Sequence, residues 1–119
     1  MRLEDVRKLI RFHTRMGMFV CRSNRSNVVS FLHGFEYGAG GECRFTSLLS
    51  EHLAEGYGVE KDSLGWPHQI ERLAEQNSLD WMDLYLVVSG EVLRPYLERY
   101  VAPSEDETES GAETGSGEV

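Results

Sequence analysis

Six side chains in this sequence are of the types that bind transition metals or act as nucleophiles and bases. They are His13, His33, His52, His68, Cys21 and Cys43. Their spacing matches no common metal-binding pattern, because the sequence has no Cys-x-x-Cys, no His-Glu-x-x-His and no two histidines four residues apart. We therefore expect no metal site, no catalytic residues and no cofactor, and we interpret the chain as non-enzymatic.

The two cysteines are the remaining candidates for chemistry. A cysteine nucleophile needs a histidine base and an electropositive setting, and Arg22 follows Cys21 while Arg44 follows Cys43. Both cysteines also have apolar neighbours, and small buried cysteines are common core residues, which favours buried, free thiols. The N-terminus has charges spread through it and lacks the apolar core of a signal peptide, which favours a cytoplasmic location.

The charged residues are distributed unevenly along the chain. Residues 1–25 contain seven basic and two acidic residues, residues 26–102 contain five basic and twelve acidic residues, and residues 103–119 contain six acidic residues and no basic one. The three segments therefore carry net charges of +5, −7 and −6, within a total of −8. Such asymmetry creates opposed surface fields only if the fold keeps the segments apart.

Arg7, Arg11 and Arg15 follow one another at four-residue steps, which places them on one face of a helix. This face could bind phosphate, and a nucleic-acid-associated regulator is the alternative function that it suggests. However, a nucleic-acid binder is usually basic overall, whereas residues 1–102 carry a net charge of −2 and the acidic tail would repel phosphate. We favour a solvated helix surface, and nucleic acid is a disfavoured partner.

Apolar residues recur at three- and four-residue steps along most of the chain, which predicts helices rather than strands. The predicted helices cover residues 3–16, a segment from an N-cap within 22–27 to about 37, a segment from 45 or 46 to just before 56 or 58, residues 66–76, a segment capped by Ser78, and residues 91–101. Met18 to Cys21 is too short to assign and is either an extended connector or a lone short strand. The fold class is therefore mainly α, a compact bundle of five or six short helices.

The boundary between the last two predicted helices has two alternatives. Ser78 is the expected N-cap of the first of them, and its expected buried face consists of Leu79, Met82, Leu86 and Val87. Ser89-Gly90 and Pro95 then offer two alternatives, which are one kinked helix or two separate helices. We favour two helices, with Pro95 near the start of the second.

The chain divides into a helical domain, residues 1–102, and an acidic tail, residues 103–119. The tail consists largely of Ser, Glu, Gly and Thr, and ordering it would cost backbone entropy that no burial offsets, which predicts disorder. The longest apolar run, Leu84 to Val88, is far too short for a membrane helix, so we expect no membrane partner.

Two short motifs connect the chain to a known group of proteins. Met16-Gly-Met-Phe-Val is followed a dozen residues later by Phe31-Leu-His-Gly-Phe-Glu-Tyr, and this resembles a "PGMYIG…FLxGY" pattern found in small bacterial proteins. The similarity extends over roughly residues 3–100, through Phe45 to Leu53 and Gly65-Trp66-Pro67, although Met16 replaces the usual proline and Cys21 the usual glycine. Some members of that group resemble immunity proteins of interbacterial toxin systems, which bind and block a toxin without catalysis.

The resemblance, the small size and the absence of catalytic motifs lead to one main hypothesis. The chain is expected to be a protein-binding module of the immunity type, whose partner is a toxin encoded by an adjacent gene. A basic toxin would be attracted by acidic groups, because complementary charge steers encounter and enforces partner choice. The expected partner-binding residues are Glu51, Glu55, Glu60 and Asp62.

Overall fold

The computed structural model describes residues 1–20 and 22–107, with side chains described as far as Arg99. Within these residues the chain forms five α-helices and one short 3-10 helix, and no β-strand. They are α1 (Leu3–Thr14), η1 (Met16–Met18), α2 (Arg25–Gly38), α3 (Phe45–Gly56), α4 (Trp66–Asn77) and α5 (Trp81–Glu107). The predicted mainly α bundle is confirmed.

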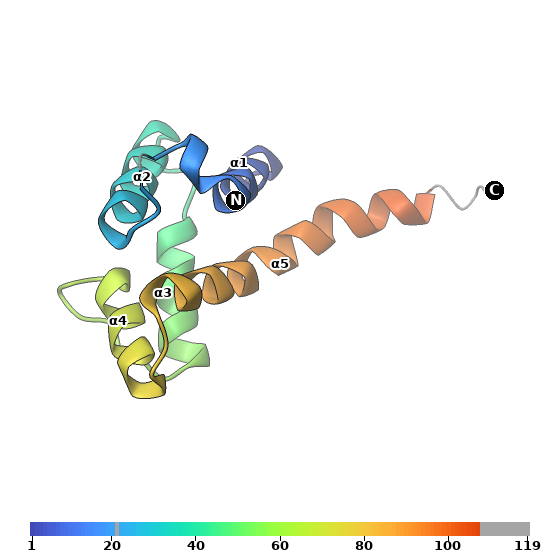
Figure 1. The fold of residues 1–119 in the computed structure, drawn as a ribbon. Coiled ribbons are helices and arrows are strands. Elements are labelled where there is room, and N and C mark those ends of the chain that lie inside the picture. The colour runs from blue at the N-terminus through green and yellow to red at the C-terminus, as the bar shows by residue number, and fades with distance from the viewer. Residues whose placement is uncertain (21, 108–119) are drawn as a thin grey trace.

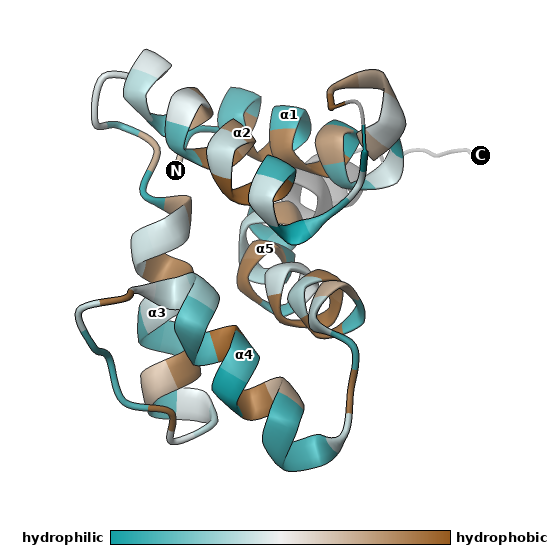
Figure 2. Cartoon of the chain, turned by 60° about the vertical axis from the view of Figure 1, so that its left-hand side comes forward, coloured by the Kyte–Doolittle hydropathy of each residue, from teal (hydrophilic) through white to brown (hydrophobic). Residues whose placement is uncertain are grey.

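Helix α5 organises the bundle, because α1, α3 and α4 all pack against its N-terminal half. Its C-terminal half projects away from the other helices (Figure 1). The apolar stretches of α1 and α2 face inward (Figure 2). The fully buried core residues come from every α-helix and are Val6, Leu9, Phe12, Val28, Leu32, Phe45, Leu49, Leu53, Ile70, Tyr85 and Val88.

The segment after α1 is helical rather than extended. Helix α1 ends at Thr14, two residues before the predicted end, and η1 follows. The amide N–H groups of Met18, Phe19 and Val20 donate to carbonyl oxygens of Arg15 and Met16, three or four residues back. These short-range bonds exclude an extended connector over residues 18–20, and residue 21 lies outside the described residues.

The prediction that Ser78 caps α5 is wrong. Ser78 instead closes α4 in a left-handed conformation, with φ 55° and ψ 44°. Asp80 performs the expected role, since its Oδ2 accepts hydrogen bonds from the N–H groups of Met82 and Asp83 at 3.0 and 3.2 Å. A carboxylate satisfies free N–H groups at a helix start and also favours the positive end of the dipole.

The preferred division into two helices at Ser89-Gly90 is also wrong, because α5 continues unbroken through this pair and through Pro95. A helical glycine costs about 1 kcal/mol relative to alanine, but Val88, Val92 and Leu93 are buried on either side of it. Burial of three such side chains outweighs that cost. The helix ends at Glu107, five residues beyond the predicted domain boundary, and the rest of the predicted tail lies outside the described residues.

A hydrogen bond inside the core joins the first helix to the last. His13 Nε2 on α1 lies 2.7 Å from the hydroxyl oxygen of Tyr85 on α5. Burial lowers the pKa of His13 to about 4, because a charged imidazolium is poorly solvated in this position. His13 is therefore neutral in the folded protein at pH 7.

We predict that stability decreases as the pH falls below about 6.5. In the unfolded chain His13 takes up a proton near its ordinary pKa of about 6.5, whereas the folded protein does so only near pH 4. The free energy of unfolding should therefore fall by roughly 1 kcal/mol per pH unit between about pH 6 and pH 4. Urea unfolding of the wild type and of His13→Gln, which has no titrating ring, measures this slope. Parallel pH profiles for the two proteins would contradict it.

Candidate functional site

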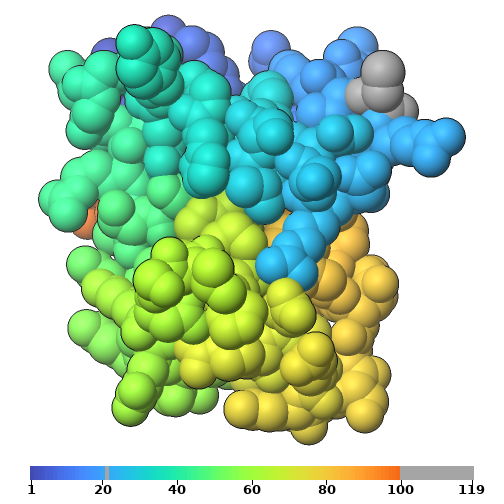
Figure 3. Space-filling model, turned by 90° about the vertical axis from the view of Figure 1, so that its left-hand side faces the viewer, coloured from blue at the N-terminus to red at the C-terminus, as the bar shows by residue number. Residues whose placement is uncertain are grey.

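The fold places the basic helix α1 far from one part of the acidic segment, although the ion pairs Arg2–Glu42 and Arg25–Glu71 join the two segments elsewhere. Helix α1, which carries Arg7 and Arg11 and is followed directly by Arg15, lies at one end of the molecule, and the C-terminal half of α3 and the following loop lie at the other (Figure 1). In the space-filling view the blue and cyan surface of residues 1–38 is above the yellow-green surface of residues 57–77 (Figure 3). The arginines of the N-terminal segment therefore lie away from the carboxylates near the C-terminal end of α3.

The arginine face, defined as Arg7 and Arg11 on α1 and Arg15 just after the end of that helix, is exposed. In the described part of the chain, none of these side chains forms an ion pair. They border a shallow hollow of about 670 Å³, which is completed by Ile10, Thr14, Met18 and Phe19. Met18 is 74% exposed and Phe19 43%. Positive and apolar side chains are thus available together on this surface.

Three of the four acidic residues predicted to bind a partner are exposed and unpaired. Glu51 and Glu55 lie one turn apart on α3, and Glu60 lies in the loop between α3 and α4. Among the described residues, none of the three carboxylates forms an ion pair with a basic side chain. These three groups can therefore meet a partner without first losing an internal contact.

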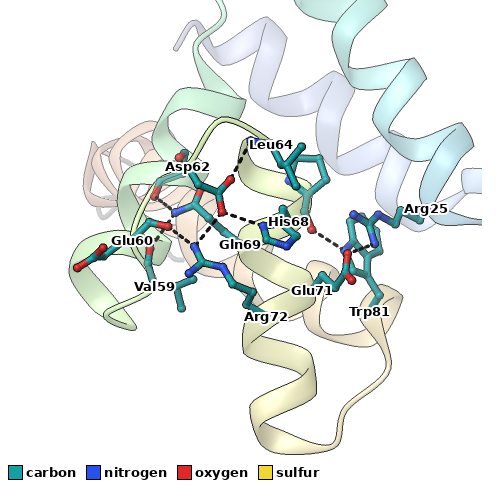
Figure 4. A network of polar contacts seen from close by, with 12 residues as sticks. Arg25, Val59, Glu60, Asp62, Leu64, His68, Gln69, Glu71, Arg72 and Trp81 are labelled. Atoms are coloured by element: carbon teal, nitrogen blue, oxygen red, sulfur yellow. Dashed lines mark hydrogen bonds and ion pairs between the residues drawn. The ribbon is translucent and has the colours of Figure 1, made fainter.

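The fourth residue, Asp62, already contacts groups of its own loop and of α4 (Figure 4). Its carboxylate accepts hydrogen bonds from the N–H of Leu64 at 2.8 Å and from Nδ1 of His68 at 2.7 Å, and it lies 3.3 Å from Nη2 of Arg72. The hydrogen bond with His68 is the main reason that the pKa of Asp62 is below its ordinary value. The structure thus shows Asp62 holding the loop against α4.

A buried amide holds the other side of the same loop. Gln69 is fully buried, and its Oε1 accepts a hydrogen bond from the Ser50 hydroxyl at 2.6 Å. Its Nε2 donates to the carbonyl oxygens of Val59 at 2.9 Å and Ser50 at 3.2 Å. One side chain of α4 therefore joins α3 to the loop that carries Glu60. No local sequence pattern pointed to this role.

Two histidine–carboxylate pairs resemble the histidine and carboxylate of a catalytic dyad. They are Asp62–His68 and Glu91–His52, with Nε2 of His52 2.8 Å from Oε1 of Glu91. In the described residues, no hydroxyl or thiol hydrogen-bonds to either of these rings. Burial also raises the pKa of the Cys43 thiol, which disfavours a thiolate there.

The remaining candidate chemistry is sparse in the part of the chain that the structure describes. Cys21 lies outside that part. No cluster of three or more His, Cys, Asp or Glu side chains there could hold a metal ion. His33 is exposed on α2. The interpretation of the chain as non-enzymatic stays a prediction.

An apolar hollow that the sequence did not indicate lies where α3, α4 and α5 meet. It has a volume of about 340 Å³ and is lined by Tyr57, Leu73, Asn77, Leu79, Asp83, Leu84 and Val87. Leu79 is 51% exposed and Val87 56%. The prediction that Leu79, Leu86 and Val87 form the buried face of α5 is therefore wrong, because the core-facing residues are Leu84, Tyr85 and Val88.

Comparison with models of protein families, with curated proteins and with solved structures gave no match. The resemblance of residues 3–100 to small bacterial proteins of the immunity type stays a prediction. None of the described helices combines the length and the apolar character required to cross a membrane.

We predict that Gln69→Leu destabilises the protein by roughly 2 kcal/mol. Leucine cannot replace the hydrogen bonds that the Gln69 amide forms with the Ser50 hydroxyl and with the carbonyl oxygens of Val59 and Ser50. Urea unfolding monitored by circular dichroism measures the change. Gln76→Leu, at an exposed position of the same helix, is the control and should cost far less. Equal effects of the two substitutions would show that the buried amide contributes nothing specific.

Proposed function

We propose that this chain is a non-enzymatic protein-binding module that acts as an immunity-type inhibitor of a toxin encoded by an adjacent gene. The observation that supports the proposal is the set of exposed, unpaired carboxylates of Glu51, Glu55 and Glu60, at the end of the molecule away from the arginine face. Carboxylates that pair with nothing inside the protein attract a basic partner without the cost of breaking an ion pair.

The surroundings of these carboxylates suit protein binding better than small-molecule chemistry. Glu55 lies two residues before Tyr57, which lines the apolar hollow. Protein interfaces commonly combine an apolar centre with a polar, charged rim. The charge would speed association and select the partner, and the apolar centre would supply most of the affinity.

We expect the product of the adjacent gene to co-purify with this chain and to lose its toxicity in cells that express both. Glu51→Lys/Glu55→Lys should slow association at low salt by about tenfold, because it reverses the steering charge. Surface plasmon resonance measures the rate. Glu75→Lys/Glu98→Lys changes the net charge equally at other exposed positions and should have a much smaller effect. Failure of the wild type to bind would refute the proposed function.

A nucleic-acid-associated regulator is the second candidate, and the arginine face favours it. Arg7, Arg11 and Arg15 are unpaired among the described residues and border one hollow with the exposed ring of Phe19. Arginines together with an aromatic side chain are typical of surfaces that bind single strands. The acidic tail and the acidic opposite end of the molecule weaken this candidate.

If this second candidate is correct, binding of a labelled oligonucleotide should weaken steeply with salt. Contacts with three phosphates predict a slope of about −2 for the logarithm of the binding constant against that of the salt concentration. Fluorescence anisotropy measures the slope, and Arg7→Glu/Arg11→Glu/Arg15→Glu should abolish binding. Lys61→Glu/Arg94→Glu/Arg99→Glu, with the same charge change elsewhere, is the control. No binding by the wild type at low salt would exclude the candidate.

A further inference from the structure

We propose that the apolar hollow where α3, α4 and α5 meet, called here the junction hollow, receives an apolar side chain of the protein partner, flanked in that partner by Lys or Arg residues. The junction hollow is lined by Tyr57, Leu73, Asn77, Leu79, Asp83, Leu84 and Val87. This inference rests on the proposed function, because it identifies the surface and the chemistry by which the partner is held.

The shape of the junction hollow fits an inserted side chain. Leu73 and Leu84 are buried and form its inner part, whereas Leu79 and Val87 are more than half exposed and form its walls. Apolar side chains that line a concave surface gain from being covered, by roughly 25 cal/mol for each Å² removed from water. Anchors inserted into such pockets commonly provide most of the binding energy of an interface.

A network of hydrogen bonds fixes one wall of the junction hollow. The hydroxyl of Tyr57 donates to the carboxylate of Glu91, with its oxygen 2.7 and 2.9 Å from the two carboxylate oxygens, and His52 binds the same carboxylate at 2.8 Å. Partial burial opposes ionisation of Glu91, but these two hydrogen bonds keep its pKa below the ordinary value. The aromatic wall is therefore held in place, beside a carboxylate that is charged at neutral pH.

Asp83 is the charged residue among those that line the junction hollow, and two further carboxylates, Glu91 and Asp80, lie on or next to the same helix. Asp83 is exposed, Glu91 lies one turn after Val87 on α5, and Asp80 caps the start of that helix. His52 and Arg94 are the basic groups that act on Glu91. Carboxylates around an apolar centre favour an anchor with cationic neighbours and repel one with acidic neighbours.

The first test uses two peptides as probes with the full-length, ¹⁵N-labelled chain. One peptide carries a tryptophan between pairs of arginines, and the other carries glutamates in place of the arginines. We expect the basic peptide alone to shift the amide signals around Tyr57, Leu79 and Val87. Equal binding of both peptides, or shifts confined to other surfaces, would overturn the inference.

Substitutions in the walls of the junction hollow provide a second test, with a matched control variant at other exposed leucines. Leu79→Gln/Val87→Gln should weaken binding of the basic peptide at least tenfold, because it replaces two walls of the junction hollow by polar groups. Leu64→Gln/Leu86→Gln removes two exposed leucines that do not line it and should leave the affinity within twofold. Circular dichroism checks that both variants are folded. Equal losses in the two variants would overturn the inference.

The same variants separate this inference from the proposed function. If the adjacent gene product binds the wild type and Leu79→Gln/Val87→Gln with equal affinity, the proposed function stands and the inference is wrong. If that product does not bind the wild type, the proposed function is wrong, and the peptide experiment alone decides the chemistry of the junction hollow.

A second copy of this chain could also present an apolar group beside arginines, through its exposed Met18. Self-association that the basic peptide displaces, seen by sedimentation equilibrium, would identify that copy as the occupant and overturn the inference.

Discussion

The burial of Tyr85 is the constraint on which the rest of the structure depends. Its ring stacks on Trp81 with centroids 5.5 Å apart, packs against Trp66 at 5.7 Å and meets His13 edge-on at 5.3 Å. Helices α1, α4 and α5 therefore converge on one side chain. A buried tyrosine also needs a partner for its hydroxyl, and His13 supplies it. This requirement helps to set how α5 is rotated about its axis. The rotation in turn decides which residues of α5 face the solvent.

That rotation explains what could and could not be predicted from the sequence. Helix starts at Phe45 and Trp66 follow from local signals, namely the Gly40-Gly41 break and Pro67 in a first turn. The exposure of Glu51 and Glu55 follows from their spacing on a helix. Residues 84–88 are apolar without interruption, however, and such a run has no preferred side. The packing of Trp66 and His13 against Tyr85, together with the burial of Leu84 and Val88, leaves Val87 facing outward.

The polar contacts of the candidate site were beyond local reasoning for a different reason. Glu91 is 39 residues from His52 and 34 from Tyr57 in the sequence, and Gln69 is 19 residues from Ser50. No periodic pattern connects positions so far apart. Asp62 is exposed, as expected of a carboxylate in a polar loop, but a histidine and an arginine of α4 hold it. Charge in a sequence indicates the sign of a surface, but only tertiary contacts decide which charges are available.

The projecting half of α5 has a consequence for local opening. A single helix runs from the Trp81–Tyr85 stack, where three other helices cover it, to a segment beyond their reach (Figure 1). Backbone hydrogen bonds in its first half can open only when the core opens, whereas those near its C-terminal end can open by fraying. Amide hydrogen exchange along this one helix should therefore follow a gradient, from rates set by global unfolding to rates near those of a free peptide. The position where the gradient rises would mark the end of the cooperative unit in solution.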